Sequence, residues 1–138
     1  MTLVVYEDLP LDRFLPALAR LAETLKPMDL RLANVGIFTG VGSVLFLGPV
    51  VTTELLALHD RLHRELAEFA SHCLAHYLPG AWVPHVTLAM GVKSDALSKA
   101  IATSIAQWKP AQAGLEVFRL VEFFPVRTAY RRTLSSSP

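Results

Sequence analysis

Two halves of this chain repeat the same order of sequence patterns, and this repeat constrains the fold more than any other feature. Residues 2–6 can be laid on residues 87–91, and a short polar turn follows each segment. A run with helical periodicity comes next in each half, and both runs end in Lys-Pro, where proline prevents a helix from continuing. Two apolar segments then follow. Each repeat, about 50 residues long, is therefore expected to form a strand, a helix and two further strands.

The bounds of the expected elements follow from hydrophobic periodicity. Apolar residues recur at three- and four-residue steps from Phe14 to Leu25 and from Leu97 to Trp108, as in amphipathic helices. A longer helix over residues 53–74 links the repeats, with Thr52 or Thr53 as its N-cap. The other expected elements are strands over residues 30–38, 43–51, 115–124 and 128–134, and a hairpin turn over residues 39–42.

The connections between these elements predict the fold class. Adjacent strands joined by short turns pair in antiparallel fashion. We therefore expect an α+β fold of two pseudo-symmetric lobes, whose antiparallel sheets face a central groove and whose helices lie outside. We expect a single domain over residues 1–138, with a first repeat at 1–51, a linking helix at 52–75 and a second repeat at 82–134.

The strongest candidate for chemistry is a His-x-Thr motif on an apolar strand. Residues i and i+2 of a strand point to the same face, so His85 and Thr87 are expected to project side by side. An imidazole beside a hydroxyl donor suits acid/base work on a phosphate ester. The simpler alternative is a buried histidine with a structural threonine partner.

The repeat predicts a second motif that is incomplete. If Thr2 corresponds to Thr87, then Met1 corresponds to Val86, and the partner of His85 falls one position before the first residue of this sequence. We therefore expect either a single catalytic histidine or a first strand cut within its motif.

Four aromatic residues are candidates for substrate binding. Tyr77 and Trp82 flank the His85 strand, where they could stack on a nucleobase or could fill space beneath a loop. Phe38 and Phe124 stand at matched places in the two repeats, where they could line the groove or could belong to the core.

Other arrangements of reactive residues are weakly supported. His59 and His63 lie four residues apart, as zinc ligands can, but we interpret them as part of a solvated helix face and expect no metal. Ser43, Ser71 and Cys73 lack a nucleophile elbow, so serine or cysteine catalysis is not expected. The sequence implies no cofactor.

Composition sets the remaining bounds. Hydrophobic residues make up 52% of the chain and charged residues 18%, so a homodimer that covers apolar surface is one expectation. The net charge of +1 gives no support for non-specific binding to duplex nucleic acid. A single cysteine, Cys73, suits a reducing cytoplasm, and no apolar run is long enough to span a membrane.

The motif and its surroundings resemble the two-histidine phosphoesterase superfamily, the LigT-like group that includes bacterial 2′-5′ RNA ligases and cyclic nucleotide phosphodiesterases. The similarity rests on residues 84–89 and extends to residues 44–47, 55–63 and 77–82. The family also has a strand and a helix before its first motif, and its first motif contains a histidine. Neither is present in this sequence.

The resemblance implies an enzyme that needs no metal and acts on RNA ends or small cyclic nucleotides. A 2′,3′-cyclic phosphate or a 2′,5′ linkage would lie between the lobes. One imidazole would act as base, the other would act as acid, and the hydroxyls of Thr2 and Thr87 would bind phosphoryl oxygens. We expect low activity from this sequence and higher activity from a form with a longer N-terminus. The alternatives are a non-catalytic nucleotide- or RNA-binding module and an assembly domain that a partner completes.

Overall fold

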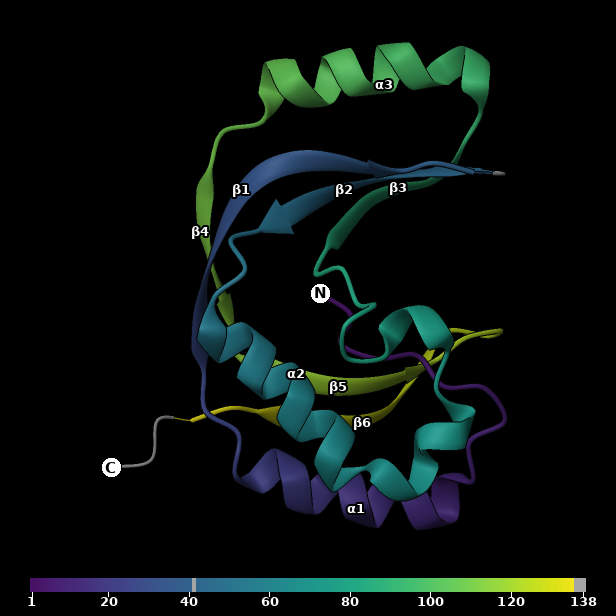
Figure 1. Cartoon of the computed structure of the whole chain (residues 1–138), viewed down its shortest axis with the longest axis vertical. Coiled ribbons are helices and arrows are strands. Elements are labelled where there is room, and N and C mark those ends of the chain that lie inside the picture. Colours follow the sequence, from purple (N-terminus) through teal and green to yellow (C-terminus); the bar gives the residue numbers. More distant parts are fainter. Residues whose placement is uncertain (41, 136–138) are drawn as a thin grey trace.

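In the computed structural model, which describes residues 1–40 and 42–135, helices and strands alternate along the chain (Figure 1). The helices are α1 (Leu11–Glu23), α2 (Thr53–Glu65) and α3 (Ser94–Gln107), with 3-10 turns η1 (Ala67–His72) and η2 (Ala75–Tyr77). The strands are β1 (Met28–Phe38), β2 (Ser43–Pro49), β3 (Val86–Val92), β4 (Ala111–Leu115), β5 (Val117–Glu122) and β6 (Arg127–Thr133).

The strands form a curled four-stranded antiparallel sheet and a separate hairpin, which confirms the predicted α+β fold. The order in the larger sheet is β3-β2-β1-β4, and β5 pairs with β6. Strand β1 is shared: residues Met28 to Leu32 pair with β4, and the segment from Leu32 to Phe38 pairs with β2. Because β1 changes its partner at Leu32, the sheet curls around the opening that Figure 1 shows.

The predicted strand over residues 115–124 is two strands in the structure. The chain pairs with β1 up to Leu115 and pairs with β6 from Val117 onward. Glu116 lies where the partner changes, which explains the break between β4 and β5. The expected hairpin turn over residues 39–42 does join β1 to β2, although residue 41 lies outside the described residues.

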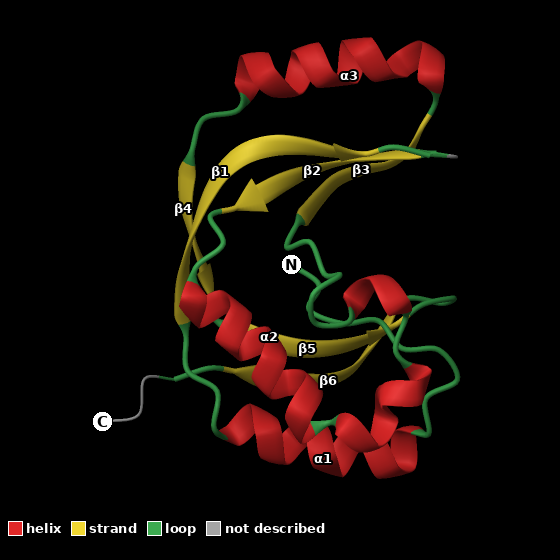
Figure 2. Ribbon diagram, viewed as in Figure 1, coloured by secondary structure: helices red, strands yellow, loops and turns green. Residues whose placement is uncertain are grey.

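The larger of the two buried clusters lies where α1 and α2 meet the β5–β6 hairpin. Phe14, which is 1% exposed, packs edge-on against Tyr6 and Phe69 with ring centroids 5.1 and 5.0 Å apart. One face of the hairpin joins this core through Phe118, Leu120 and Tyr130. The opposite face of the hairpin therefore points away from α1, towards the opening (Figure 2).

The predicted strand over residues 2–6 does not join a sheet. Its backbone is extended, but its only pairing among the described residues is the single bridge between Tyr6 and Cys73. Two hydrogen bonds flank that bridge: Leu74 N–H donates to the Val5 carbonyl and Glu7 N–H donates to the His72 carbonyl. The segment is thus tied to the turns after α2 rather than to a strand.

The predicted helix over residues 53–74 is shorter than expected. Thr52 caps it as predicted, because its hydroxyl accepts from the Leu55 N–H at 3.2 Å. The α-helix ends at Glu65, where Leu66 leaves helical geometry with φ −107° and ψ 22°. The chain then continues as the 3-10 turn η1.

Helix α3 lies on the outer side of the four-stranded sheet, away from the opening (Figure 2). None of its residues is buried, and its Ile105 is 64% exposed. The helix therefore adds little to the core. Within residues 1–40 and 42–135, no helix has the length and apolar character needed to cross a membrane.

Candidate functional site

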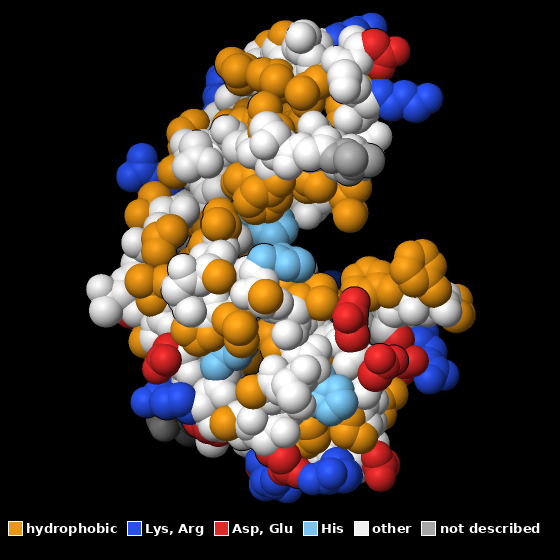
Figure 3. All heavy atoms as spheres, turned by 45° about the vertical axis from the view of Figure 1, so that its right-hand side comes forward, with side chains coloured by type: hydrophobic (Ala, Val, Ile, Leu, Met, Phe, Trp, Pro, Cys, Tyr) orange, Lys and Arg blue, Asp and Glu red, His pale blue; other side chains and the backbone are white. Residues whose placement is uncertain are grey.

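The candidate site faces a hollow that divides the molecule. Figure 3 shows this hollow between the part that carries β1, β2 and β3 and the part that carries α1 and α2, with histidine side chains on its inner surface. Most of the sequence-predicted residues lie on the two walls of this hollow, and the two walls are built differently.

His85 and Thr87 lie on the wall formed by the four-stranded sheet. His85 directly precedes β3, and Thr87 is the second residue of the strand. In the register Thr87 stands opposite Phe46, so both side chains share the face that bears the His85 ring. Thr87 is exposed and His85 is half-buried, so a ligand in the hollow could reach both side chains.

Two phenylalanines support the His85 ring. Phe38 and Phe46 stack with centroids 4.3 Å apart, and His85 meets them edge-on at 4.9 and 5.6 Å. Phe46 lies directly over Gly36, where a Cβ atom would come within 2.3 Å of its ring. Any side chain at residue 36 would therefore displace the ring that supports His85.

A backbone hydrogen bond sets the orientation and tautomer of His85. Its Nδ1 lies 2.8 Å from the Val83 carbonyl oxygen. Because a carbonyl can only accept, Nδ1 must carry the proton and donate. In the neutral ring the lone pair is then on Nε2, which has no hydrogen-bond partner among the described residues. Nε2 is thus free to accept a proton from a ligand in the hollow.

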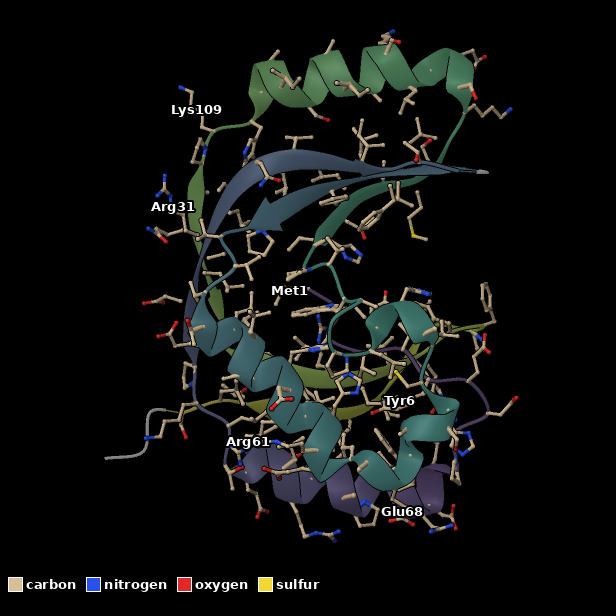
Figure 4. The ribbon with its side chains drawn as sticks, in the orientation of Figure 1. Met1, Tyr6, Arg31, Arg61, Glu68 and Lys109 are labelled. Atoms are coloured by element: carbon tan, nitrogen blue, oxygen red, sulfur yellow. The ribbon has the colours of Figure 1, made fainter. Side chains whose placement is uncertain are left out.

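Met1 and Thr2 belong to the other wall. Figure 4 shows Met1 in the opening beneath β3. The Trp82 indole N–H donates to the Thr2 carbonyl at 3.2 Å, which ties this segment to the loop that leads into His85. The Thr2 side chain is exposed. The pKa of the Met1 amino group is lowered by burial and by the nearby Arg119 guanidinium.

A cavity of about 850 Å³ lies between the N-terminal segment and β5. Its lining includes Thr2, Phe124 and Arg119, but neither His85 nor Thr87. Phe124 is 98% exposed at the turn between β5 and β6. The structure therefore brings Phe38 next to His85 and Thr87, whereas Phe124 lies on the opposite wall with Thr2.

Trp82 and Tyr77 pack behind the site. Trp82 is buried, and His59 stacks on its ring with centroids 4.0 Å apart and planes 2° apart. That face of the indole is covered, and the side chain belongs to a core cluster with Leu30 and Leu55. Tyr77 packs against the same cluster, and its carbonyl accepts from His59 Nε2 at 3.0 Å.

The interpretation of His59 as part of a solvated helix face is wrong. His59 is 3% exposed, because the loop that carries Tyr77 and Trp82 folds over α2. Its Nε2 lies 3.2 Å from that of His63. Burial lowers the pKa of both imidazoles, and for His59 the neighbouring His63 lowers it further. In the described part of the chain, no three His, Cys, Asp or Glu side chains gather as a metal ion would require.

Phe46 and the arginines of the hairpin were not among the site residues predicted from the sequence. Phe46 could have been found from the expected hairpin, because the residue opposite it in register is Gly36. Arg119 and Arg131 stand directly opposite each other on β5 and β6. The expected pairing of the last two strands could have predicted that these like charges stand opposite each other.

Comparisons with known proteins agree with the motif. A family model described as the 2′-5′ RNA ligase superfamily matches residues 1–123. A protein of Bacillus licheniformis named "Putative phosphoesterase" is 29% identical over 86 residues, which cover 62% of this chain and 47% of that protein. The chain thus spans about half the length of this curated relative.

Proposed function

Because this chain belongs to the 2′-5′ RNA ligase superfamily, we propose that it acts as a phosphoesterase on a 2′,3′-cyclic phosphate or a 2′,5′ linkage held beside His85. The observation that carries this proposal is the fixed orientation of the His85 ring. Nδ1 is held by the Val83 carbonyl, Nε2 has no hydrogen-bond partner among the described residues, and Thr87 lies on the face of the sheet that bears the ring.

The proposed step is hydrolysis of the cyclic ester. His85 Nε2 takes a proton from a water molecule as the water oxygen attacks phosphorus. One ribose oxygen leaves phosphorus and takes a proton from solvent in the hollow, which gives a phosphomonoester. The Thr87 hydroxyl donates to a non-bridging phosphoryl oxygen and stabilises the charge that develops there.

Only one histidine of this chain lies in a His-x-Thr motif. The other four lie between residues 59 and 76, on α2 and the turns after it. With base catalysis from His85 alone, the leaving oxygen has no histidine to protonate it. We therefore propose a low turnover for residues 1–138, because general acid catalysis contributes roughly 10²–10⁴-fold.

The test is a hydrolysis assay on 2′,3′-cyclic nucleotides and on a 2′,5′-linked dinucleotide, with parent chain, His85→Ala and His76→Ala. His76 is exposed and lies in η2, away from the strand that carries Thr87, so its variant is the matched control. We expect His85→Ala to lower turnover by roughly 10²-fold or more and His76→Ala to leave it unchanged. Equal turnover in all three chains would overturn the proposal.

A second candidate function, nucleotide binding without turnover, is favoured by the presence of one His-x-Thr motif rather than two in this sequence. Isothermal titration with a 2′,3′-cyclic nucleotide separates the two. Binding with no product, and with an unchanged dissociation constant in His85→Ala, would favour the binding module.

A further inference from the structure

The β5–β6 hairpin presents two arginines towards the hollow. Arg119 and Arg131 are cross-strand partners, so their side chains leave the same face of the hairpin about 5 Å apart at Cβ. Phe118, Leu120 and Tyr130 occupy the other face and pack on the core of α1 and α2. The arginine face therefore points away from α1 and towards the opening (Figure 2).

The two arginines are not neutralised within the described residues. Within residues 1–40 and 42–135, no carboxylate lies within 4.0 Å of either guanidinium, whereas Arg127 on the same hairpin pairs with Glu122 at 2.9 Å. Like charges directly opposite each other destabilise a β-ladder. The repulsion between Arg119 and Arg131 therefore destabilises the unbound protein. A bound anion would offset this repulsion.

Arg119 is next to the N-terminal wall of the site. It lines the same cavity as Met1 and Thr2. The Thr2 carbonyl accepts a hydrogen bond from Trp82, three residues before His85. The N-terminal segment therefore lies between the His85 loop and the arginines. A phosphate at the arginines would thus lie across the N-terminal segment from His85.

We propose that Arg119 and Arg131 bind a second phosphate, so that the substrate is an oligonucleotide end rather than a mononucleotide. This inference rests on the proposed function for the reacting phosphate at His85. Arginine suits the task because its planar guanidinium donates two parallel hydrogen bonds to phosphate oxygens. The ligand chemistry is that of a ribonucleotide chain with one phosphodiester next to its cyclic terminus.

The test compares two ligands: a ribonucleoside 2′,3′-cyclic phosphate and a dinucleotide that carries the same cyclic end and one further phosphodiester. Dissociation constants are measured for the parent chain, Arg119→Gln, Arg131→Gln and Arg132→Gln. Arg132 is the matched control, because it adjoins Arg131 in β6 but leaves the other face, opposite Phe118.

We expect the parent to bind the dinucleotide about tenfold or more tightly than the mononucleotide, as for hydrogen bonds to charged groups. Arg119→Gln and Arg131→Gln should lose that advantage and leave mononucleotide binding unchanged. Each substitution should also make the slope of log K for the dinucleotide against log salt concentration less steep by about 0.7, because one contact with phosphate is lost. If both variants keep the parent's preference, or if Arg132→Gln loses it equally, the proposal is wrong.

Binding of pyrophosphate tests the arginine site independently of the function proposed for His85. If neither nucleotide binds to any variant, the function assigned to His85 fails, while the arginine site stays testable. Pyrophosphate should then raise the melting temperature of the parent and of His85→Ala, but not that of Arg119→Gln. An equal rise in Arg119→Gln would overturn the second phosphate site.

Discussion

The two walls of the hollow carry the two segments that were expected to be equivalent from the sequence, residues 2–6 and 87–91, yet they are held in different ways. On one wall, β3 is paired along its length with β2, and the His85 ring rests on Phe38 and Phe46. On the other wall, residues 1–6 form no ladder, and the bonds from Trp82 and Leu74 hold them.

This difference shows which half of the site is organised before a ligand binds. A catalytic group is effective when packing and hydrogen bonds already hold it in its productive geometry. His85 meets that condition through its Nδ1 bond and its aromatic support. Thr2 has a fixed carbonyl but an exposed side chain, so its hydroxyl is less constrained.

The largest expected effect comes from adding a second histidine to the wall that carries Thr2. A variant with one histidine placed directly before Met1 would give this wall the same His-x-Thr pattern as residues 85–87. We expect cyclic-ester hydrolysis to rise by about 10²-fold, because a second imidazole can protonate the leaving oxygen. A chain with alanine at that place is the control, and equal rates in the two chains would contradict the expectation.

The two threonines should differ in effect. Thr87→Ala is expected to slow hydrolysis by about tenfold, as for loss of a hydrogen bond to a charged group. Thr2→Ala should cost less, because no ladder fixes its strand. In the chain with the added histidine, the cost of Thr2→Ala should approach that of Thr87→Ala. Equal costs in the parent chain would show that both walls are equally organised.

Trp82→Phe should destabilise the wall formed by residues 2–6 without affecting the wall that contains β3. The change keeps an aromatic ring beside His59 but removes the donor to the Thr2 carbonyl. We expect a loss of about 1 kcal/mol in the free energy of unfolding. Amide exchange should become faster at residues 2–6 and remain unchanged in β3. Faster exchange in β3 would mean that Trp82 supports the sheet wall as well.

The sequence predicted the parts of this structure that local chemistry decides. Periodicity located α1 and α3, the proline residues explained their ends, and the i, i+2 rule placed Thr87 beside His85. It could not show that Glu116 stands where the chain changes its strand partner, because that depends on β1, about 80 residues away. Nor could it show that His59 is buried, since the covering residue Trp82 comes from a later loop.

The smallest expected effect concerns the pH dependence of stability that His59 and His63 produce. His59 and His63 have folded pKa values below that of a free imidazole, and nearby Asp60 offsets the shift only in part. Below about pH 6.5, the unfolded chain therefore binds more protons than the folded chain does. Stability is then fully present above that pH and declines as the pH falls through the folded pKa values.

Urea unfolding at pH 7.5 and at pH 5.5 measures this decline. His63→Gln should lessen it, because the variant removes one neutral imidazole and the repulsion that it exerts on a protonated His59. His76→Gln, at an exposed position, should leave the decline as it is in the parent chain. If His63→Gln and the parent lose the same free energy of unfolding between pH 7.5 and pH 5.5, the His59–His63 pair is not the cause of the decline.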